Sequence, residues 1–306
     1  MKNTGKHNKR KKIIYAVIII LIIASLYMFF YEPEYKGSIK SPDKVLVISH
    51  RGFGVHAPDN SLAGAKLALS NGLDGIDVDG QLTKDGYLVI FHDLSVDRLT
   101  NATGRVGAKT LEELLRLDLG PKYNESFKGS YVATFEEFVK NVNGSAILMV
   151  ELKVTKAGRT GIEETAVEII RKHNVFDYVY LSSFNPLVLY RLKKLDSRVH
   201  TVFILMDTNW NEELLKEIII PEDRVDLPWM LRQEPIRKAI RKIIKPDLLS
   251  VNYRVDDNTI NTLIKKGNPI FLWTPNNKTD IQRSLDKNPY GVITDEPLLG
   301  KSLRDR

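Results

Sequence analysis

The chain of 306 residues contains no cysteine, which excludes disulfide bonds, thiolate metal sites and a cysteine nucleophile. It also lacks the glycine-rich nucleotide-binding loop and the G-x-S-x-G turn that carries a serine nucleophile. Hydrophobic residues make up 43% of the sequence and charged residues 27%, as in an ordinary globular protein. The length suffices for a single large domain such as a (β/α)8 barrel, which needs about 250 residues.

Acidic residues are absent from the first 31 residues, although basic residues are frequent there. This segment supplies most of the net charge of +7, so the rest of the chain is close to neutral. The pI of about 9.2 therefore does not indicate a nucleic-acid-binding surface, and we expect no nucleic-acid partner. The basic residues of the segment are Lys2, Lys6, Lys9, Arg10, Lys11 and Lys12.

An uncharged apolar run, IIYAVIIILIIASLYMFFY, covers residues 13–31. About 20 such residues form a helix long enough to cross a bilayer, and the positive-inside rule places the preceding basic block in the cytoplasm. We therefore predict a single-pass membrane protein with a basic cytoplasmic tail (1–12), a transmembrane anchor (13–31), a polar stalk (32–44) and an extracytoplasmic remainder. The alternative is a cleaved signal peptide, whose apolar region is shorter and ends in small residues.

Beyond residue 44, short β-rich apolar runs alternate with amphipathic helical stretches, which indicates a parallel sheet with crossover helices. Eight such units predict a closed barrel at 45–300. The expected strands are 45–50, 75–83, 146–153, 178–184, 200–206, 247–253, 270–274 and 291–295, and helices are expected at 61–71, 161–173, 186–195 and 257–266, among others.

Two stretches are longer than the simple strand–helix unit of a barrel requires. Residues 86–93 form an extra strand directly after the second one, because the turn between them contains an Asp-Gly pair, a strong hairpin signal. Residues 94–145 then form an insertion before the third strand. Residues 207–246 are also long, and their basic helix from Arg232 to Lys245 is either a solvated surface or a contact with anionic lipid.

Polar residues stand near the carboxyl ends of most predicted strands, where the chemistry of barrel enzymes gathers. Packing alone explains so many such positions poorly, although some could be ordinary strand-end caps. They are His50, Asp77, Asp79, Glu151, Lys153, Ser183, Asn252, Trp273, Thr274 and Asp295.

Asp77 and Asp79 alternate on the second strand, so both carboxylates share one face. Two close anionic groups raise each other's pKa unless a cation lies between them. An all-oxygen site suits a hard divalent cation, Ca²⁺ or Mg²⁺, for which Glu151 could be the third ligand. The alternative is a pair of exposed aspartates on an edge strand, which the apolar flanking residues do not favour.

Two histidines, His50 and His92, are expected at strand ends, and histidine is the usual general acid or base near neutral pH. Arg51 follows His50, and an arginine fork suits phosphate oxygens. Lys153 shares a face with Glu151 and either forms a salt bridge or reaches a phosphate. These residue types are the ones that phosphodiester cleavage requires.

Taken together, these runs resemble the signature of the glycerophosphodiester phosphodiesterase family over residues 45–300. The matching runs are His50-Arg51-Gly52, Ala57-Pro58-Asp59-Asn60-Ser61, Gly75-Ile76-Asp77-Val78-Asp79, Leu82-Thr83-Lys84-Asp85-Gly86, Phe91-His92-Asp93, Glu151-Leu152-Lys153, Ser183-Phe184, Trp273-Thr274 and Ile293-Thr294-Asp295-Glu296-Pro297.

The resemblance implies a TIM (β/α)8 barrel with a small insertion after the hairpin, and release of glycerol 3-phosphate and an alcohol from a glycerophosphodiester. It also implies the roles of the site residues. By analogy, His50 and His92 are the acid–base pair, Asp77, Asp79 and Glu151 hold one divalent metal ion, Arg51 and Lys153 bind the phosphate, and Trp273 lines the pocket.

The chain departs from the family pattern at Asp77, where glutamate is usual, at Gly80, where a larger residue is usual, and in the run Pro-Asp-Asn-Ser. The shorter side chain of Asp77 draws its carboxylate back by about one bond length, against calcium–oxygen distances of about 2.3–2.6 Å.

Two other functions are open at this point. One is a lysophospholipase D that acts on membrane lysophospholipids, for which residues 226–231 could form an apolar groove. The other is a non-catalytic binding module at the cell surface, which should show erosion of the catalytic residues.

Overall fold

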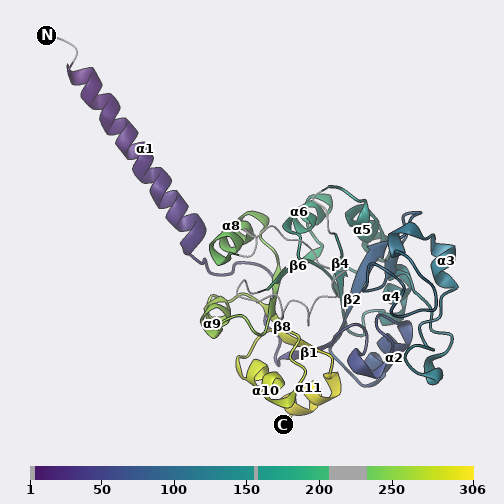
Figure 1. Ribbon diagram of the computed structural model, residues 1–306. Coiled ribbons are helices and arrows are strands. Elements are labelled where there is room, and N and C mark those ends of the chain that lie inside the picture. The colour runs from purple at the N-terminus through teal and green to yellow at the C-terminus, as the bar shows by residue number, and fades with distance from the viewer. Residues whose placement is uncertain (1–3, 155–157, 207–232) are drawn as a thin grey trace. The chain divides into compact units, whose positions relative to one another are not determined.

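The computed structural model describes residues 4–154, 158–206 and 233–306 (Figure 1). The chain forms two compact units. The first comprises residues 1–34 and 227–245, and the second comprises residues 35–226 and 246–306. The apolar groove considered at 226–231 lies outside the described residues.

The first unit is built around the long helix α1 (Thr4–Phe30), whose segment Arg10–Phe30 is long and apolar enough to cross a membrane, with a mean hydropathy of 2.8. The basic helix α8 (Glu234–Ile244) belongs to the same unit. Its Arg241 donates a hydrogen bond of 2.6 Å to Glu32, and its Lys242 donates one of 2.8 Å to the carbonyl of Met28. The end of α1 is therefore tied to α8 by buried and partly buried polar contacts.

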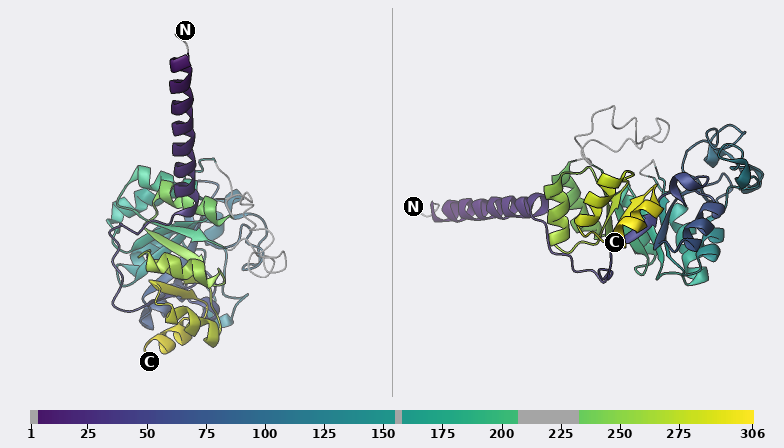
Figure 2. Two further views of the ribbon diagram at one scale, coloured as in Figure 1. Left: turned by 90° about the vertical axis from the view of Figure 1, so that its left-hand side faces the viewer. Right: turned by 90° about the horizontal axis from the view of Figure 1, so that it is seen from below.

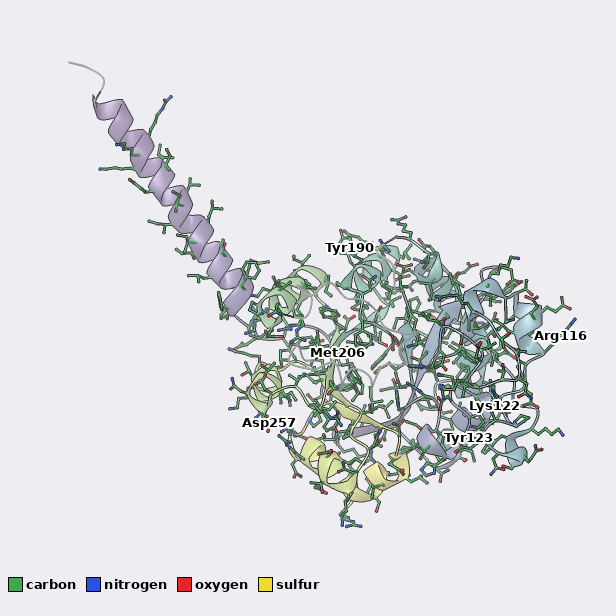
Figure 3. All side chains as sticks on the ribbon, viewed as in Figure 1. Arg116, Lys122, Tyr123, Tyr190, Met206 and Asp257 are labelled. Carbon is green, nitrogen blue, oxygen red and sulfur yellow. The ribbon has the colours of Figure 1, made fainter. Side chains whose placement is uncertain are left out.

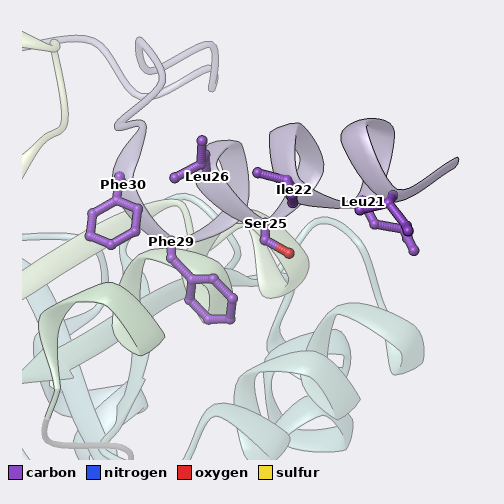
Figure 4. A pocket seen from close by; sticks show the side chains of 7 residues that line it. Leu21, Ile22, Ser25, Leu26, Phe29 and Phe30 are labelled. Carbon is purple, nitrogen blue, oxygen red and sulfur yellow. The ribbon is translucent and has the colours of Figure 1, made fainter. Parts of the chain in front are cut away.

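A hollow of about 310 Å³ lies along one side of α1 (Figure 4). All seven lining residues come from this one helix, and Ser25 is the only polar one among them. The hollow is therefore part of an apolar helix surface. It is lined by Ile18, Leu21, Ile22, Ser25, Leu26, Phe29 and Phe30.

The second unit is a closed barrel of eight parallel strands, each hydrogen-bonded to its neighbours. β1 closes the ring by pairing with both β2 and β9. The predicted TIM-type architecture is confirmed. The barrel strands are β1 (Leu46–Ser49), β2 (Gly75–Leu82), β4 (Ile147–Leu152), β5 (Val179–Ser183), β6 (His200–Leu205), β7 (Leu248–Asn252), β8 (Ile270–Trp273) and β9 (Gly291–Thr294).

Helices surround the strands in Figure 1, and Figure 2 shows the same elements from two further sides. The expected helices correspond to α2, α5, α6 and α9, with ends that differ by no more than two residues. In the second unit the helices outside the insertion are α2 (Leu62–Ser70), α4 (Phe135–Val142), α5 (Ile162–His173), α6 (Pro186–Leu195), α9 (Asp257–Lys265), α10 (Lys278–Asp286) and α11 (Pro297–Arg304), together with the short 3-10 helix η1 (Gly54–His56).

The extra strand β3 (Leu88–Ile90) pairs antiparallel with β2, as the Asp-Gly turn predicts. The chain then runs through η2 (Val106–Ala108), α3 (Leu111–Leu115) and η3 (Glu125–Phe127) around a separate apolar cluster that includes Val89, Phe91 and Val106. α4 follows these elements and leads into β4, so the end of the range 94–145 belongs to the ring of helices. The insertion is thus a small body attached to the hairpin.

The barrel interior is filled by a layer of apolar side chains. The predicted site residues stand two positions further along the strands. Side chains alternate along a strand, so residues i and i+2 face the same side. His50 therefore follows Ile48, Glu151 follows Met149, Trp273 follows Phe271, and Asp295 follows Ile293. The apolar layer consists of Ile48, Met149, Tyr180, Val202, Leu248, Phe271 and Ile293, with Ile39 from the expected stalk packed against it.

Candidate active site

The loop after β1 brings His50 and Arg51 to the carboxyl end of the barrel. The backbone amide of His50 donates to the carbonyl of Thr294 at 3.0 Å, which continues the β1–β9 ladder. Arg51 has a positive φ of 50°, so the chain turns sharply there. Gly54 also has a positive φ, and a Cβ at this position would come within 2.0 Å of the carbonyl oxygen of Asp295. The close approach of the β1 and β9 loops therefore requires glycine at position 54.

The imidazole of His50 is paired with a carboxylate. Its Nδ1 donates a hydrogen bond of 2.6 Å to Oδ1 of Asp295. Burial disfavours the charged ring, but the negative charge of Asp295 and this hydrogen bond outweigh burial and raise the pKa of His50 above its usual value. In the same pair, burial opposes ionisation of Asp295, yet the His50 charge lowers the pKa of that carboxyl to about 2. His50 is thus held as a proton donor.

The imidazole of His92 has the opposite surroundings. Its Nδ1 lies 2.8 Å from Oδ1 of Asp93, and its Nε2 lies 2.7 Å from Nη2 of Arg51. A carboxylate can only accept and a guanidinium can only donate, so the ring is neutral, with its proton on Nδ1. Burial and then the positive charge of Lys153 lower the pKa of His92 to about 4. His92 is thus held as a proton acceptor.

The three candidate metal ligands gather on β2 and β4. Asp79 and Glu151 are direct cross-strand partners, and Asp77 stands two residues before Asp79 on the same face. Lys153 lies between two of the carboxylates, with its Nζ 3.2 Å from Oδ1 of Asp79 and 3.6 Å from Oε1 of Glu151. The four side chains that the sequence predicts as one cluster are therefore brought together.

Burial and mutual repulsion divide the charge unequally among these carboxyls. Burial, followed by the charges of Asp79 and Glu151, raises the pKa of Asp77 to about 8, and burial raises that of Glu151 to about 7. Burial acts in the same direction on Asp79, but the nearby cations of Lys153 and Arg51 and a hydrogen bond from Asn60 lower its pKa. The site therefore gathers more carboxylate groups than its cations neutralise.

This donor set fits a hard divalent cation, since all three groups offer oxygen and lack sufficient counter-charge. Their spacing differs from a coordination shell: no three acidic or histidine side chains of the described residues stand at ligand distances from a common point. Lys153 occupies the ion-pair position between Asp79 and Glu151 instead.

Trp273 ends β8 on the opposite side of the barrel from β2 and β4. Its ring packs edge to face against Phe184, with the ring centroids 5.9 Å apart. The indole Nε1 is buried and has no hydrogen-bond partner among the described residues. An unsatisfied donor at the rim of the site is available to a polar group of a ligand.

Several supporting residues were not among the predicted site residues. Asn60 is fully buried and forms two hydrogen bonds of 2.9 Å with Asp79, one to its side chain and one from its backbone amide. Gln81 donates to the carbonyls of Phe91 and Asp93 at 2.8 and 2.7 Å and so fixes the end of the hairpin. The alternation on β2 could have indicated Gln81, because it continues the face of Asp77 and Asp79.

Arg98 comes from the insertion and supports the His92 pair. Its Nε donates to Asp93 at 2.6 Å, and its Nη2 donates to Asp59 at 2.9 Å. Asp59 in turn accepts from Arg51 at 3.2 Å. The insertion is therefore coupled to the site by one arginine that has no local sequence signal. On the β9 side, Asn276 donates to Asp295 at 2.6 Å and orients the partner of His50.

The family model for the glycerophosphoryl diester phosphodiesterase family matches residues 50–299. The chain belongs to this family. A glycerophosphodiester phosphodiesterase of Caldanaerobacter subterraneus subsp. tengcongensis is 34% identical over 257 residues, which cover 83% of this chain and 95% of that protein. A glycerophosphodiester phosphodiesterase of Bacillus subtilis is 26% identical and covers 94% of this chain and 96% of its own.

Solved structures show the same fold. A phosphodiesterase of Oleispira antarctica, in complex with the product sn-glycerol-3-phosphate, superposes with a TM-score of 0.70 at 22% identity, covering 86% of this chain and 98% of its own. A glycerophosphodiester phosphodiesterase of Thermotoga maritima has a TM-score of 0.62 at 25% identity, with 86% and 100% covered. This family of enzymes hydrolyses glycerophosphodiesters and generally uses a divalent metal ion.

The pairing of His50 with Asp295 generates a prediction for an Asp295→Asn variant. Because the carboxylate raises the pKa of His50, its removal lowers that pKa. In the role of general acid that the sequence predicts for His50, the ring must be protonated, so the alkaline limb of the kcat/KM profile should shift toward lower pH. The measurement is kcat/KM for glycerophosphoethanolamine between pH 5 and pH 10.

Glu296→Gln is the matched control, because Glu296 follows Asp295 directly but pairs with His56 at 3.2 Å. This variant should leave the alkaline limb where it is. An Asp295→Asn profile with an unmoved alkaline limb would contradict the assigned role of the carboxylate.

Proposed function

We propose that this member of the family hydrolyses glycerophosphodiesters to glycerol 3-phosphate and an alcohol by acid–base catalysis with His50 and His92. The observation that carries the proposal is the contrast in hydrogen-bond partners, because the ring of His50 meets a carboxylate whereas Nε2 of His92 meets a guanidinium. Two titratable groups whose surroundings push their pKa values apart are a general sign of an acid–base pair. The pKa of His92 is lowered to about 4 and that of His50 is raised.

His92 is the base in this proposal. Its Nε2 lone pair accepts a hydrogen bond from Arg51 in the absence of substrate. A guanidinium binds phosphate oxygens through two parallel hydrogen bonds, so a bound phosphodiester competes for Arg51 and frees Nε2. The ring then takes the proton of the attacking oxygen. That oxygen belongs to water or to a hydroxyl of the substrate, and the second route passes through a cyclic phosphate.

His50 is the acid. Asp295 holds its Nδ1, which leaves the Nε2 proton for the leaving oxygen. As the bond between phosphorus and that oxygen breaks, His50 gives up its proton and the alcohol departs neutral. One proton enters His92 and one leaves His50, so the pair returns to its starting state by a single net proton transfer between the rings through solvent.

The anionic phosphate requires positive charge around it. Arg51 and Lys153 supply two fixed cations, and Trp273 forms a wall on the β8 side. Asp77, Asp79 and Glu151 would hold a divalent metal ion, Ca²⁺ or Mg²⁺. Such an ion would neutralise charge that develops on the phosphoryl oxygens. Asn60 positions Asp79 for this role through its two hydrogen bonds.

The relatives and the product complex of the Oleispira enzyme favour a small glycerophosphodiester as substrate. No observation on the described residues favours a lysophospholipid, since the segment expected to form an apolar groove lies outside them. A binding module without activity would not need two histidines held in opposite protonation states.

We further propose that α1 anchors the enzyme in a membrane, with the N-terminus in the cytoplasm and the barrel outside. The segment Arg10–Phe30 has the length and hydropathy of a spanning helix. The basic residues before it favour the cytoplasmic side. The apolar side of α1 in Figure 4 then faces lipid.

Replacement of either histidine tests the catalytic proposal. His50→Ala and His92→Ala should each lower kcat by about 10²–10⁴-fold, the usual contribution of a positioned acid or base. Release of glycerol 3-phosphate from glycerophosphoethanolamine is measured with protein stripped of metal and supplied again with Ca²⁺ or Mg²⁺. The stripped wild type should be inactive until metal is restored.

His173→Ala is the control, because His173 pairs with Glu136 at 2.8 Å between α4 and α5. It should retain wild-type kcat. Full activity of His50→Ala or His92→Ala, or metal-independent turnover by the stripped wild type, would overturn this mechanism.

The membrane proposal predicts that the expressed chain keeps its first 31 residues and stays with membranes at alkaline pH in carbonate. A double Ile19→Lys, Ile22→Lys variant should move to the soluble fraction, because each central lysine costs about 2.5–3.5 kcal/mol on insertion. Intact mass and fractionation are the measurements. A soluble wild-type chain that begins near residue 32 would show a cleaved signal sequence instead.

A further inference from the structure

A pocket of about 180 Å³ lies beside the active site, between the β2–β3 hairpin, η2 and the segment that follows β4. Pockets for drug-sized ligands measure about 300–1,000 Å³, so this one suits a group of a few non-hydrogen atoms. Its polar lining comes from Gln81, Lys153, Arg105 and Thr160, and the other lining residues are apolar or glycine.

Two lining residues connect the pocket to the catalytic groups. Lys153 contacts Asp79 and Glu151, as described above. Gln81 holds the carbonyls on either side of His92. A phosphodiester bound at Arg51 and Lys153 would therefore have one of its two ester arms next to this pocket.

The backbone of Arg105 is firmly placed. The amide of Val96 donates to the carbonyl of Gly104 at 3.0 Å, and the amide of Val106 donates to the carbonyl of Leu94 at 2.9 Å. Arg105 is thus held on both sides by the segment that directly follows Asp93. Val106 is fully buried in the apolar cluster of the insertion. The extended Arg105 before it faces the other way, toward the pocket that it lines.

The charge of this lining is positive. Among the residues that the structure describes, the pocket wall contains two cations and no acid. The charge of Lys153 is balanced by Asp79 and Glu151. The guanidinium of Arg105, by contrast, forms no hydrogen bond or ion pair with any described residue, although its backbone carbonyl accepts from the amide of Ala108 at 3.1 Å. A free guanidinium fork in a concave site is suited to a planar or tetrahedral anion.

We propose that Arg105 and this pocket bind the alcohol group of the substrate and favour alcohols that carry a negative charge of their own. The inference rests on the proposed hydrolysis of glycerophosphodiesters and adds its specificity. The shared chemistry is an anion next to the scissile phosphate, either a carboxylate, as in a serine group, or a second phosphate, as in a phosphorylated glycerol group.

Two matched pairs of substrates test the proposal on the full chain. Glycerophosphoserine differs from glycerophosphoethanolamine by one carboxylate, and glycerophosphoglycerol phosphate differs from glycerophosphoglycerol by one phosphate. The wild type should show a higher kcat/KM for the charged member of at least one pair, and the pair that responds identifies the anion.

Arg105→Gln should reduce this preference about tenfold, mainly through a higher KM, because the lost contact is made before and during the reaction alike. Arg105→Lys keeps the charge without the fork and should recover part of the preference. Arg116→Gln is the control, since Arg116 lies on the outer side of the insertion, where it pairs with Glu112 (Figure 3). It should leave the preference unchanged.

The failures of the two proposals are distinguishable. Turnover of all four substrates with equal kcat/KM within each pair, or a preference that Arg105→Gln does not change, would overturn the subsite and leave the proposed function standing. No turnover of any substrate by the metal-loaded wild type would overturn the proposed function and the subsite with it.

Discussion

The contact between the Arg51 guanidinium and the ring of His92 joins the two halves of the site, and the other features depend on it. Nη2 of Arg51, in the loop after β1, lies 2.7 Å from Nε2 of His92, at the end of the β2–β3 hairpin. Because a guanidinium can only donate, it also fixes the protonation of the ring. Asp93 completes the arrangement from the other side, and Arg98 holds Asp93. A small insertion thereby contacts the group that we propose as the catalytic base.

The balance of buried charges explains how the three carboxyls on β2 and β4 are surrounded. Three carboxyls lie together at the ends of β2 and β4, and burial alone would favour their neutral forms. Lys153, Arg51 and the hydrogen bond that Asn60 donates to the carboxylate keep Asp79 ionised, whereas the pKa values of Asp77 and Glu151 remain raised. Carboxyls in this condition favour a cation, and Arg51 and Lys153 next to them favour a phosphate, in line with the proposed function. The same excess of buried carboxyl groups would destabilise a protein core, and it is the feature on which the proposed metal binding rests.

The eight strands could be predicted from the sequence because each is a short apolar run bounded by turn residues. The alternation of side chains along a strand then indicated which residues at the strand ends face the same side. The structure places Asp77 and Asp79 along β2, and His50, Glu151 and Lys153 at or just after strand ends, as the period of two predicts, since they continue faces that begin with Ile48, Gly75 and Met149. The shorter Asp77 was the main departure from the family pattern, and it now stands out as the carboxyl with the most strongly raised pKa.

The supporting groups could not be predicted in the same way. Arg98 and Arg105 lie in the insertion, where no strand period relates sequence spacing to direction. Their positions depend on contacts between backbone segments, such as those of Val96 with Gly104. The carboxylate that pairs with each histidine could not be predicted from the strand period either. Asp93 is adjacent to His92 in sequence, but Asp295 meets His50 only because the barrel closes between β1 and β9.

The central claim is that the two histidines are held in opposite protonation states before substrate binds. It can be tested most directly by nitrogen NMR of the full chain labelled at histidine, near pH 6.5, with the single alanine variants used for assignment. The account predicts a neutral His92 ring with its proton on Nδ1 and a His50 ring protonated on both nitrogens. A charged His92 or a neutral His50 at this pH would contradict it.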